Sequence, residues 1–276
     1  MAHAPALNVL IEQRSPAVLE VPERLNTRAA TALASESSAM APSKLIMGVQ
    51  DGVLTLSLNR PEKLNAIDND LSRDLLSALA TASSDPSVRV VVVNGNGKAF
   101  CAGRDISTAP TDEDLVLVQA VSMAIVDLTK PLIAAVHGWT VGAGLEWMLN
   151  ADVAIAASSA RFKLPEASIG VFVTGGLTAT LPAYAGLARA KALMLLGEEF
   201  SPTQALDWGL LWRVVPPDQL DSESRRVARQ IASLRPEVVS QYKRVLNAVG
   251  LPKFHRAIEL ESEAQRAIAG HQVSPG

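Results

Sequence analysis

Cysteine and histidine are scarce in this sequence. Its 276 residues include one cysteine, Cys101, and four histidines, His3, His137, His255 and His271. A lone cysteine cannot form an intramolecular disulfide, and the histidines do not have the spacing of metal ligands. We therefore predict no metal site. Cys101 is expected to be a small buried residue rather than a nucleophile, and His137 to end a strand rather than to act as a base.

The sequence also lacks a basic excess and a long apolar run. It has 25 Lys and Arg against 28 Asp and Glu, a net charge of −3 and a pI near 5.9. This balance argues against nucleic acid as the main partner. No apolar run reaches the ~18 residues of a membrane-spanning helix. With 48% hydrophobic and 19% charged residues, the chain has ample material for a buried core, and we expect a cytoplasmic enzyme.

Residues 1–43 lack any sustained hydrophobic periodicity. They are rich in small residues and contain several prolines, a composition typical of a poorly ordered arm. Organelle-targeting segments are poor in acidic residues, whereas this arm contains Glu12, Glu20, Glu23 and Glu36. We therefore expect a disordered arm rather than a targeting peptide.

Regular patterns begin at residue 44. Residues 45–49 and 53–58 predict a hairpin, because the Asp-Gly pair between them readily adopts the positive φ angles of a tight turn. Apolar spacing predicts a helix over 68–82, and a valine run predicts a strand over 88–93. A second turn of small residues follows at 102–103. Strands, turns and helices therefore alternate, which indicates an α/β fold.

The last third of the sequence has a different pattern. Its apolar spacing predicts helices over 189–196, 202–209, 219–234, 236–249 and 253–269. We therefore expect residues 201–276 to form a helical region. The polar side chains of Arg225, Arg226, Arg229 and Gln230 are expected to lie on a solvated face of one of these helices.

One stretch, residues 130–176, is suited to holding a negatively charged oxygen. The apolar run 132–136 predicts a buried strand, and residues 145–149 predict a helix. Between them lies Gly142-Ala143-Gly144, where a ligand can approach the backbone closely. The first N–H groups of a helix have no partner within the helix and lie at the positive end of its dipole. We therefore expect an anion-binding site at this turn.

Two carboxylates belong to the same stretch. Glu146 falls in the first turn of the predicted helix, and Glu166 follows Pro165 after another predicted strand, residues 153–157. Two acids beside an anion site provide what proton transfer next to a carbonyl requires. Each acid also has a simpler interpretation: Glu146 as a surface residue that complements the helix dipole, and Glu166 as a solvated turn residue.

Three blocks of the sequence carry a family resemblance. They are residues 59–66 (NRPEKLNA), 98–105 (KAFCAGRD) and 130–176. In this order they resemble the signature regions of the crotonase (enoyl-CoA hydratase/isomerase) superfamily, and the likeness runs from about residue 44 to the end. It implies a spiral of repeated β-β-α units over 44–200, with the helical region 201–276 forming a homotrimer or homohexamer. It also implies an acyl-CoA substrate and no separate cofactor.

The resemblance also implies roles for individual residues. The backbone N–H groups of Arg104 and Ala143 would form the oxyanion hole, and Glu146 and Glu166 would be the catalytic acids. The substrate-binding residues would be Lys63, Leu64, Ala102, Gly103, Asp105, Ile106, Gly142, Trp147, Phe172, Val173 and Thr174. Family members that hydrate use both acids, whereas members that only isomerise commonly keep the second alone.

The sequence departs from the family pattern after the second acid. Where a hydratase often has Pro-Gly-Ala-Gly-Gly-Thr, this chain has Val173-Thr174 followed by two glycines. With Phe172 and Trp147 nearby, this difference favours a bulky or branched acyl group over a short fatty acyl chain. The Arg104 side chain is a candidate to bind a polar acyl group, a CoA phosphate or nothing.

These observations predict an enoyl-CoA hydratase that adds water reversibly across the 2,3 double bond through an enolate stabilised by the oxyanion hole. Three alternatives stay open from the sequence. They are a 3,2-enoyl-CoA isomerase, a lyase or hydrolase of CoA thioesters, and a protein that binds acyl-CoA without turnover.

Overall fold

The computed structural model describes residues 43–107 and 110–272. The chain divides into two units, Met1–Ala41 and Pro42–Gly276, and the description that follows concerns the second. The predictions of a disordered arm and of no targeting peptide concern residues that lie outside the described ranges.

The elements alternate along the chain. The strands are β1 (Leu45–Gln50), β2 (Val53–Leu58), β3 (Val90–Gly95), β4 (Ala99–Cys101), β5 (Leu132–Val136), β6 (Trp139–Val141), β7 (Val153–Ala157), β8 (Arg161–Lys163) and β9 (Arg213–Val215). The helices are α1 (Asn69–Ser84), α2 (Asp112–Asp127), α3 (Ala143–Asn150), α4 (Glu166–Ile169), α5 (Leu177–Ala185), α6 (Leu187–Leu196), α7 (Pro202–Asp207), α8 (Leu220–Ala232), α9 (Pro236–Gly250) and α10 (Phe254–Gln272).

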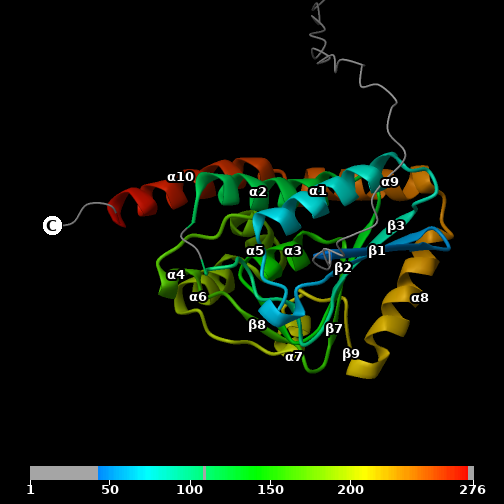
Figure 1. Ribbon diagram of the computed structural model, residues 1–276, viewed down its shortest axis with the longest axis horizontal. Helices are drawn as coiled ribbons and strands as arrows, with labels where there is room; N and C mark the ends of the chain where they lie inside the picture. Colours follow the sequence, from blue (N-terminus) through cyan, green and yellow to red (C-terminus); the bar gives the residue numbers. More distant parts are fainter. Residues whose placement is uncertain (1–42, 108–109, 273–276) are drawn as a thin grey trace, which may run out of the picture. The chain divides into compact units, whose positions relative to one another are not determined.

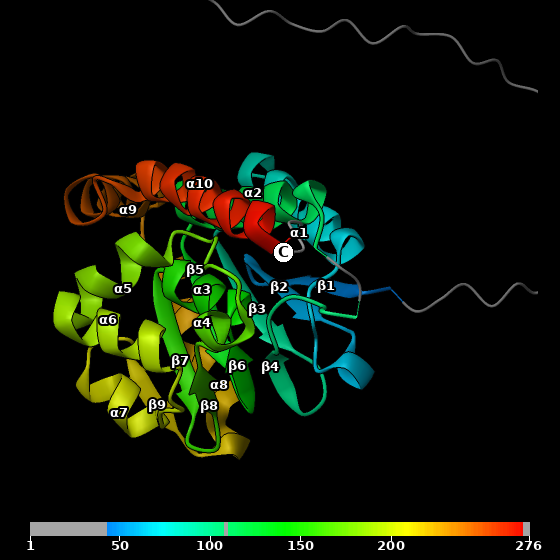
Figure 2. The same ribbon diagram turned by 90° about the vertical axis from the view of Figure 1, so that its left-hand side faces the viewer.

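The strands form two sheets in the described part of the chain. The larger has six strands in the order β1-β2-β3-β5-β7-β9, and the smaller has three in the order β4-β6-β8 (Figure 2). Only β1 and β2 pair antiparallel. Their turn contains Asp51 at φ 52° and Gly52 at φ 76°, as a two-residue hairpin requires. The predicted hairpin is confirmed.

A repeated unit generates the two sheets. In each of β3-β4-α2, β5-β6-α3 and β7-β8-α4, the first strand joins the larger sheet, the second joins the smaller sheet, and a helix follows. The neighbouring units pair in parallel in both sheets. This is the predicted spiral of β-β-α units, so the expected fold class is confirmed.

The larger sheet is covered on both faces. Helix α8 packs against β2, β3, β5 and β7 on one face, where Val90, Ile133 and Ile155 form part of a smaller core with Val227 and Ala228. On the other face, α1, α2 and α3 enclose the main core (Figure 1). Because β3, β5 and β7 are buried on both faces, they are continuous apolar runs rather than alternating patterns.

The sequence predictions fail in part at short or fully enclosed elements. The predicted helices and the strands at 88–93, 132–136 and 153–157 are present, with ends shifted by a few residues. Helices α2, α4 and α5 were not predicted. Helix α2 contacts α1 and α3 as well as α10, so its apolar residues do not form a single stripe. Helix α5 contains Pro182, and proline in a sequence argues against a helix at that position.

The region 201–276 also contains a short strand between two of its predicted helices. Strand β9 pairs with β7 at the edge of the larger sheet. Three residues are too few for a recognisable alternation, and this strand is specified by its partner in the sheet. The polar residues of α8, Arg225, Arg226, Arg229 and Gln230, are exposed as predicted.

Candidate active site

The turn after β4 leaves one backbone N–H group free. Gly103 has a φ angle of +86°, which favours glycine. The N–H of Ile67 donates to the Gly103 carbonyl at 2.8 Å, and the N–H of Asp105 donates to the Ile67 carbonyl at 2.8 Å. Among the described residues, the intervening Arg104 N–H has no hydrogen-bond acceptor. The turn therefore presents Arg104 N–H as an available donor.

A second free donor lies beside this turn. Ala143 is the first residue of α3, and Gly142 before it has φ 52° and ψ −124°, a conformation that non-glycine residues rarely adopt. The first N–H groups of a helix lack intrahelical acceptors. A β-carbon placed on Gly103 would lie 2.9 Å from the Val141 carbonyl oxygen and 3.6 Å from the Ala143 nitrogen. The two small-residue turns therefore meet.

Glu146 lies one helical turn beyond the Ala143 donor. Its side chain is 1% exposed, so its interpretation as a surface residue is wrong. The carboxyl Oε1 accepts a hydrogen bond from the Thr174 N–H at 3.0 Å. The other oxygen, Oε2, is shielded from solvent and has no partner within the described chain. A buried acid with one free oxygen is available for proton transfer.

Glu166 is the first residue of α4, and its carboxyl reaches the same place. A β-carbon on Gly142 would lie 2.5 Å from the Oε1 of Glu166, so the carboxyl rests against the residue that precedes the Ala143 donor. Its Oε2 is shielded from solvent and finds no acceptor or donor in the described residues. The interpretation of Glu166 as a solvated turn residue is therefore wrong.

Burial makes both carboxyls weak acids. Desolvation raises the pKa of Glu146 well above its usual range, and the charges of Glu261 and Glu166 raise it further, against the opposing hydrogen bonds from the 174–175 backbone. Desolvation also raises the pKa of Glu166 to about 7. The charge of Glu166 thus acts on Glu146. With raised pKa values, these two carboxyls can hold a proton near neutral pH, so one can act as the acid and the other as the base.

Ser122 is a buried neighbour of Glu146 that the sequence analysis did not identify. It comes from α2 and is fully buried, and its hydroxyl has no partner in the described residues. A β-carbon on Gly175 would lie 2.4 Å from the Glu146 Oε2 and 2.7 Å from the Ser122 Oγ. The glycine thus leaves a small space onto which both unpaired oxygens face.

Asn65 is a second buried polar residue without a predicted role. It lies in the left-handed region, at φ 56°. Its Nδ2 donates to the carbonyls of Asn96 at 2.9 Å and Ala99 at 2.8 Å, and its Oδ1 accepts from the Arg60 N–H at 2.8 Å. These bonds fix the loop that leads to Ile67 and thereby the Arg104 turn. Asparagine is one of the few residues that tolerate this conformation, so an asparagine in this loop is the feature of the sequence that could have indicated its role.

Two predicted site residues use their side chains in ion pairs. The Arg104 guanidinium pairs with Asp114 of α2 at 3.2 Å. The Asp105 carboxylate accepts hydrogen bonds from Ser107 and pairs with Arg60 at 3.0 Å. The bonds from Ser107, assisted by Arg60, lower the pKa of Asp105 to about 2. Both side chains therefore brace the turn that presents the Arg104 N–H.

The remaining predicted residues differ in exposure. Lys63, Ile106 and Phe172 are exposed, Leu64, Ala102 and Thr174 are partly buried, and Val173 is buried. Lys63 ends a short 3₁₀ helix (Pro61–Lys63) before α1 and Leu64 follows it, whereas Phe172, Val173 and Thr174 precede α5. Thr174 contacts Glu146 through its backbone. The substrate contacts assigned to these residues stay predictions.

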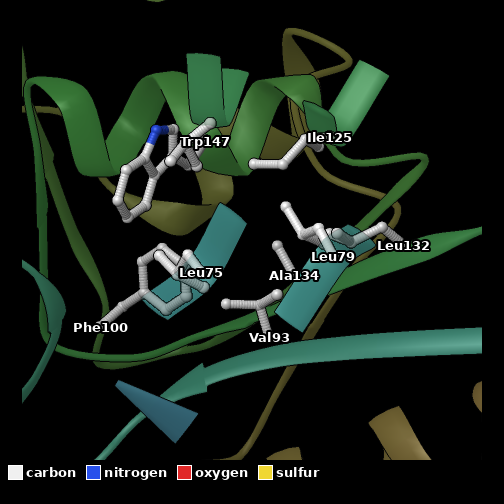
Figure 3. Close-up of a pocket in the computed structure, with 9 residues that line it drawn as sticks. Leu75, Leu79, Val93, Phe100, Ile125, Leu132, Ala134 and Trp147 are labelled. Carbon is white, nitrogen blue, oxygen red and sulfur yellow. The ribbon is translucent and has the colours of Figure 1, made fainter. Parts of the chain in front are cut away.

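Trp147 lies in the hydrophobic core. Its side chain is 3% exposed and lines an internal cavity of about 10 Å³ (Figure 3). The cavity is lined by Leu75, Leu79, Val93, Phe100, Val121, Ile125, Leu132, Ala134 and Trp147. Every lining residue is apolar, and neither Glu146 nor Glu166 is among them. The acyl contact assigned to Trp147 stays a prediction.

Cys101 and His137 have the predicted structural roles. Cys101 is completely buried, and burial raises the pKa of its thiol to about 12, so it is not a nucleophile at neutral pH. His137 follows β5, and its Nε2 lies 3.0 Å from the Gly97 carbonyl. Within residues 43–107 and 110–272, no cluster of His, Cys, Asp and Glu could hold a metal ion. In the same ranges, no helix is long and apolar enough to cross a membrane.

Comparisons with known proteins agree with this arrangement. Residues 48–273 match the enoyl-CoA hydratase/isomerase family. The 1,2-epoxyphenylacetyl-CoA isomerase of Escherichia coli is 33% identical over 239 residues, which cover 83% of this chain and 91% of that protein. The crotonyl-CoA hydratase of Syntrophomonas wolfei is 32% identical over 232 residues, covering 82% and 89%.

A solved structure gives the same result for the fold. An enoyl-CoA hydratase from Mycobacterium avium subsp. paratuberculosis superposes with a TM-score of 0.80 at 32% identity, covering 86% of this chain and 97% of that one. The fold, the paired turns and these matches define an enzyme of the crotonase superfamily. Within it, the chain belongs to the enoyl-CoA hydratase/isomerase family.

Proposed function

We propose that this protein is an enoyl-CoA hydratase that adds water reversibly across the 2,3 double bond of an acyl-CoA thioester. The observation that carries the proposal is that two carboxyls with a shielded, unpaired oxygen, Glu146 and Glu166, belong to the neighbourhood of the free Ala143 N–H: Glu146 lies in the first turn of the same helix, and Glu166 rests against Gly142. Hydration needs an acid and a base at once, and a pair that shares one proton supplies both.

In the proposed reaction, the thioester carbonyl oxygen accepts hydrogen bonds from the N–H groups of Arg104 and Ala143. A water between the two carboxyls loses a proton to the ionised one while its oxygen bonds to C3. The double-bond electrons move toward the carbonyl, which becomes an enolate held by the two N–H donors. The protonated carboxyl then donates its proton to C2, and the pair is left with one proton as before.

Isomerisation is the second candidate. Moving a double bond from the 3,4 to the 2,3 position needs the oxyanion hole and one acid that carries the proton from C2 to C4. Glu166 is suited to this step because its pKa of about 7 allows it both to accept and to release a proton at neutral pH. One relative is itself named an isomerase. A CoA-thioester lyase or hydrolase is a third candidate that would use the same hole for another intermediate.

The test is a panel of thioesters with mass detection of the products. We expect 2-enoyl-CoA substrates to lose their conjugated absorbance while their mass increases by one water. A 3-enoyl-CoA that gains conjugated absorbance without a change in mass would instead make the protein an isomerase. Release of free CoA would indicate cleavage. If no thioester reacts while acyl-CoA still binds, the protein is a binder and the proposal is wrong.

We propose a bulky or branched acyl group as the substrate class. Val173 and Thr174 stand where hydratases often have Pro-Gly, and the neighbouring Phe172 is 36% exposed. One relative bears phenylacetyl in its name. Branched and aryl members of the panel should therefore give higher kcat/KM than straight short chains.

We also propose that the chain assembles as a homotrimer or homohexamer. Helix α9 exposes an apolar face made of Val238, Tyr242, Val245, Leu246 and Val249. Their spacing of three and four residues places them on one side of the helix. An exposed stripe of this kind in a stable protein is usually covered by a partner.

Light scattering after size exclusion should give three or six times the chain mass of 29.2 kDa. The double variant Leu246→Glu with Val249→Glu should shift the protein toward the monomer, because burying two charges is costly. Exposed Lys191, on α6, offers a matched surface control as Lys191→Glu. A wild-type protein that elutes as a monomer at micromolar concentration would contradict the assembly.

The proposed chemistry uses only side chains, backbone N–H groups, water and the substrate, in which CoA is the carrier. We propose that it proceeds without a separate metal or redox cofactor, and that the enzyme acts in the cytoplasm without nucleic acid as a partner. Turnover that persists after treatment with a chelator would support the first point.

A further inference from the structure

Glu261 is a buried carboxylate that the proposed reaction does not use. It lies on α10 and is 1% exposed. Its Oε2 accepts the Gly176 N–H at 2.7 Å, and its Oε1 accepts the N–H of Thr178 at 2.8 Å and the Thr178 hydroxyl at 2.6 Å. It thereby satisfies donors at the start of α5, more than eighty residues earlier in the chain.

Helix α10 holds the whole segment before α5. Gln265 lies one turn beyond Glu261 on the same side of α10, and its Oε1 accepts the Phe172 N–H at 2.7 Å. The ring of Phe254 lies so close to Gly176 that a β-carbon there would approach it to 2.2 Å. Residues 172–178 are therefore fixed by three side chains from one helix.

The fixed segment in turn holds the first catalytic acid. Thr174 N–H donates to the Glu146 Oε1 at 3.0 Å, and Gly175 leaves the space beside the Oε2. Asn150, from the last turn of α3, also donates to the Gly175 carbonyl at 2.9 Å. A continuous set of contacts thus leads from Glu261 through residues 174–176 to the carboxyl of Glu146.

We propose that Glu261 is a positioning residue for Glu146: it fixes the 174–178 segment that binds this carboxyl, and its charge, when it is ionised, acts on that carboxyl. The inference rests on the proposed function, because it assigns Glu146 to the reaction. Glu261 itself does not touch the substrate in this arrangement.

The proposed role of Glu261 differs from that of a simple helix cap because it includes an electrostatic effect on Glu146. Three donors converge on Glu261, which favours its ionised form, although burial raises its pKa. Its charge acts on Glu146 and raises the pKa of that carboxyl. Neutral side chains can also cap a helix, so an acid here has an electrostatic consequence that capping alone does not require.

No cation faces the two buried acids from the described elements around them. Helices α3, α4 and α5 each contribute one ionisable group: Glu146, Glu166 and Tyr184. Helix α2 contributes Asp112, Glu113, Asp114 and Asp127, and α10, besides Glu261, contributes His255, Arg256, Glu259, Glu263 and Arg266. Those of α2 and α10, Glu261 aside, lie toward the helix ends or on exposed faces and form ion pairs there, as Asp127 does with His255. No cation of these elements therefore offsets the charges of Glu261 and Glu166 that act on Glu146.

The first experiment measures the pH profile of kcat/KM for Glu261→Gln on whichever thioester the wild type converts. Removing a negative charge near Glu146 and Glu166 should lower their pKa values. The acidic and the basic limb of the pH profile of kcat/KM should therefore both move to lower pH, by about one unit. The matched control is Thr178→Val, which deletes one hydrogen bond to Glu261 and keeps its charge. It should lower Tm and leave both limbs in place.

A second measurement does not depend on activity. In protein labelled with ¹³C at the glutamate carboxyl carbons, the Glu146 signal, assigned by its loss in Glu146→Gln, should titrate at lower pH in Glu261→Gln. Coulomb coupling is reciprocal, so the Glu261 signal should also titrate at lower pH in Glu146→Gln. If Glu261→Gln does not fold, the titration of Glu261 in Glu146→Gln still tests whether the two carboxyls are coupled.

The outcomes separate the two proposals. If Glu261→Gln lowers only Tm, with unchanged limbs and an unchanged Glu146 titration, Glu261 is a structural cap and the inference is overturned. If the wild type converts no thioester but the carboxyl titrations shift as expected, the coupling stands and the hydratase assignment fails.

Discussion

Replacing Glu146 by glutamine should reduce hydration by about 10²- to 10⁴-fold, the usual contribution of a general acid or base. Glutamine has nearly the same shape and can still accept the Thr174 N–H bond, which is 3.0 Å in the native protein. It cannot exchange a proton with water. The loss should therefore appear in kcat, with little change in KM.

The same substitution should leave the protein folded and at least as stable as the wild type. Glu146 is a buried carboxyl near two other acids, and an uncharged amide removes both its desolvation and the repulsion. A stability gain with a loss of activity is the combination expected of a residue retained for chemistry.

Three variants assayed together make this test decisive. Glu166→Gln should abolish both hydration and isomerisation, whereas Glu146→Gln should abolish hydration and spare isomerisation through Glu166. Glu198→Gln, at an exposed position, is the matched control and should behave as the wild type. Hydration by Glu146→Gln within a few-fold of the wild-type rate would refute its role.

The second large effect is expected for Gly142→Ala. The new methyl carbon would lie 2.5 Å from the Oε1 of Glu166. This carboxyl is at the end of a flexible side chain, so it moves away rather than unfolding the protein. Its displacement, together with a shift of the adjacent Ala143 N–H, should lower kcat by about 10²- to 10³-fold, as loss of one oxyanion donor does.

Backbone strain must be separated from this effect. At φ 52° and ψ −124°, alanine should destabilise the fold by about 1–3 kcal/mol. Gly186→Ala provides the match, because Gly186 has φ 81° and a β-carbon added there would meet no atom within 4 Å. It should lose comparable stability and retain activity. Gly142→Ala with near-normal kcat would mean that neither Glu166 nor the Ala143 N–H is placed as we describe.

Local chemistry accounts for the predictions that the structure confirms. The Asp51-Gly52 hairpin follows from the positive φ angles that these residues tolerate. The buried strands β3 and β5 follow from their continuous apolar runs. The two turns at Gly103 and Gly142 are visible in the sequence because close backbone approach requires residues without side chains.

Contacts between distant segments account for what the sequence does not reveal. Strand β9 is three residues long and exists because β7 offers it a partner. Helix α2 is packed on several sides, so its sequence lacks a clear stripe, and nothing in it singles out Ser122. Glu261 lies in a stretch whose spacing predicts only a helix, because nothing near it in sequence indicates its three hydrogen bonds to residues 176–178.

The alternation of strands and helices, the two small-residue turns and the two candidate acids can be predicted from the sequence. These depend on backbone preferences and periodicity, which act over a few neighbouring residues. In contrast, the folded chain is needed to see that the charge of Glu166 acts on Glu146, that each acid has an oxygen shielded from water, and that Glu261 also acts on Glu146. Burial and electrostatic coupling depend on which segments pack together, so the acidity of this site is a property of the fold.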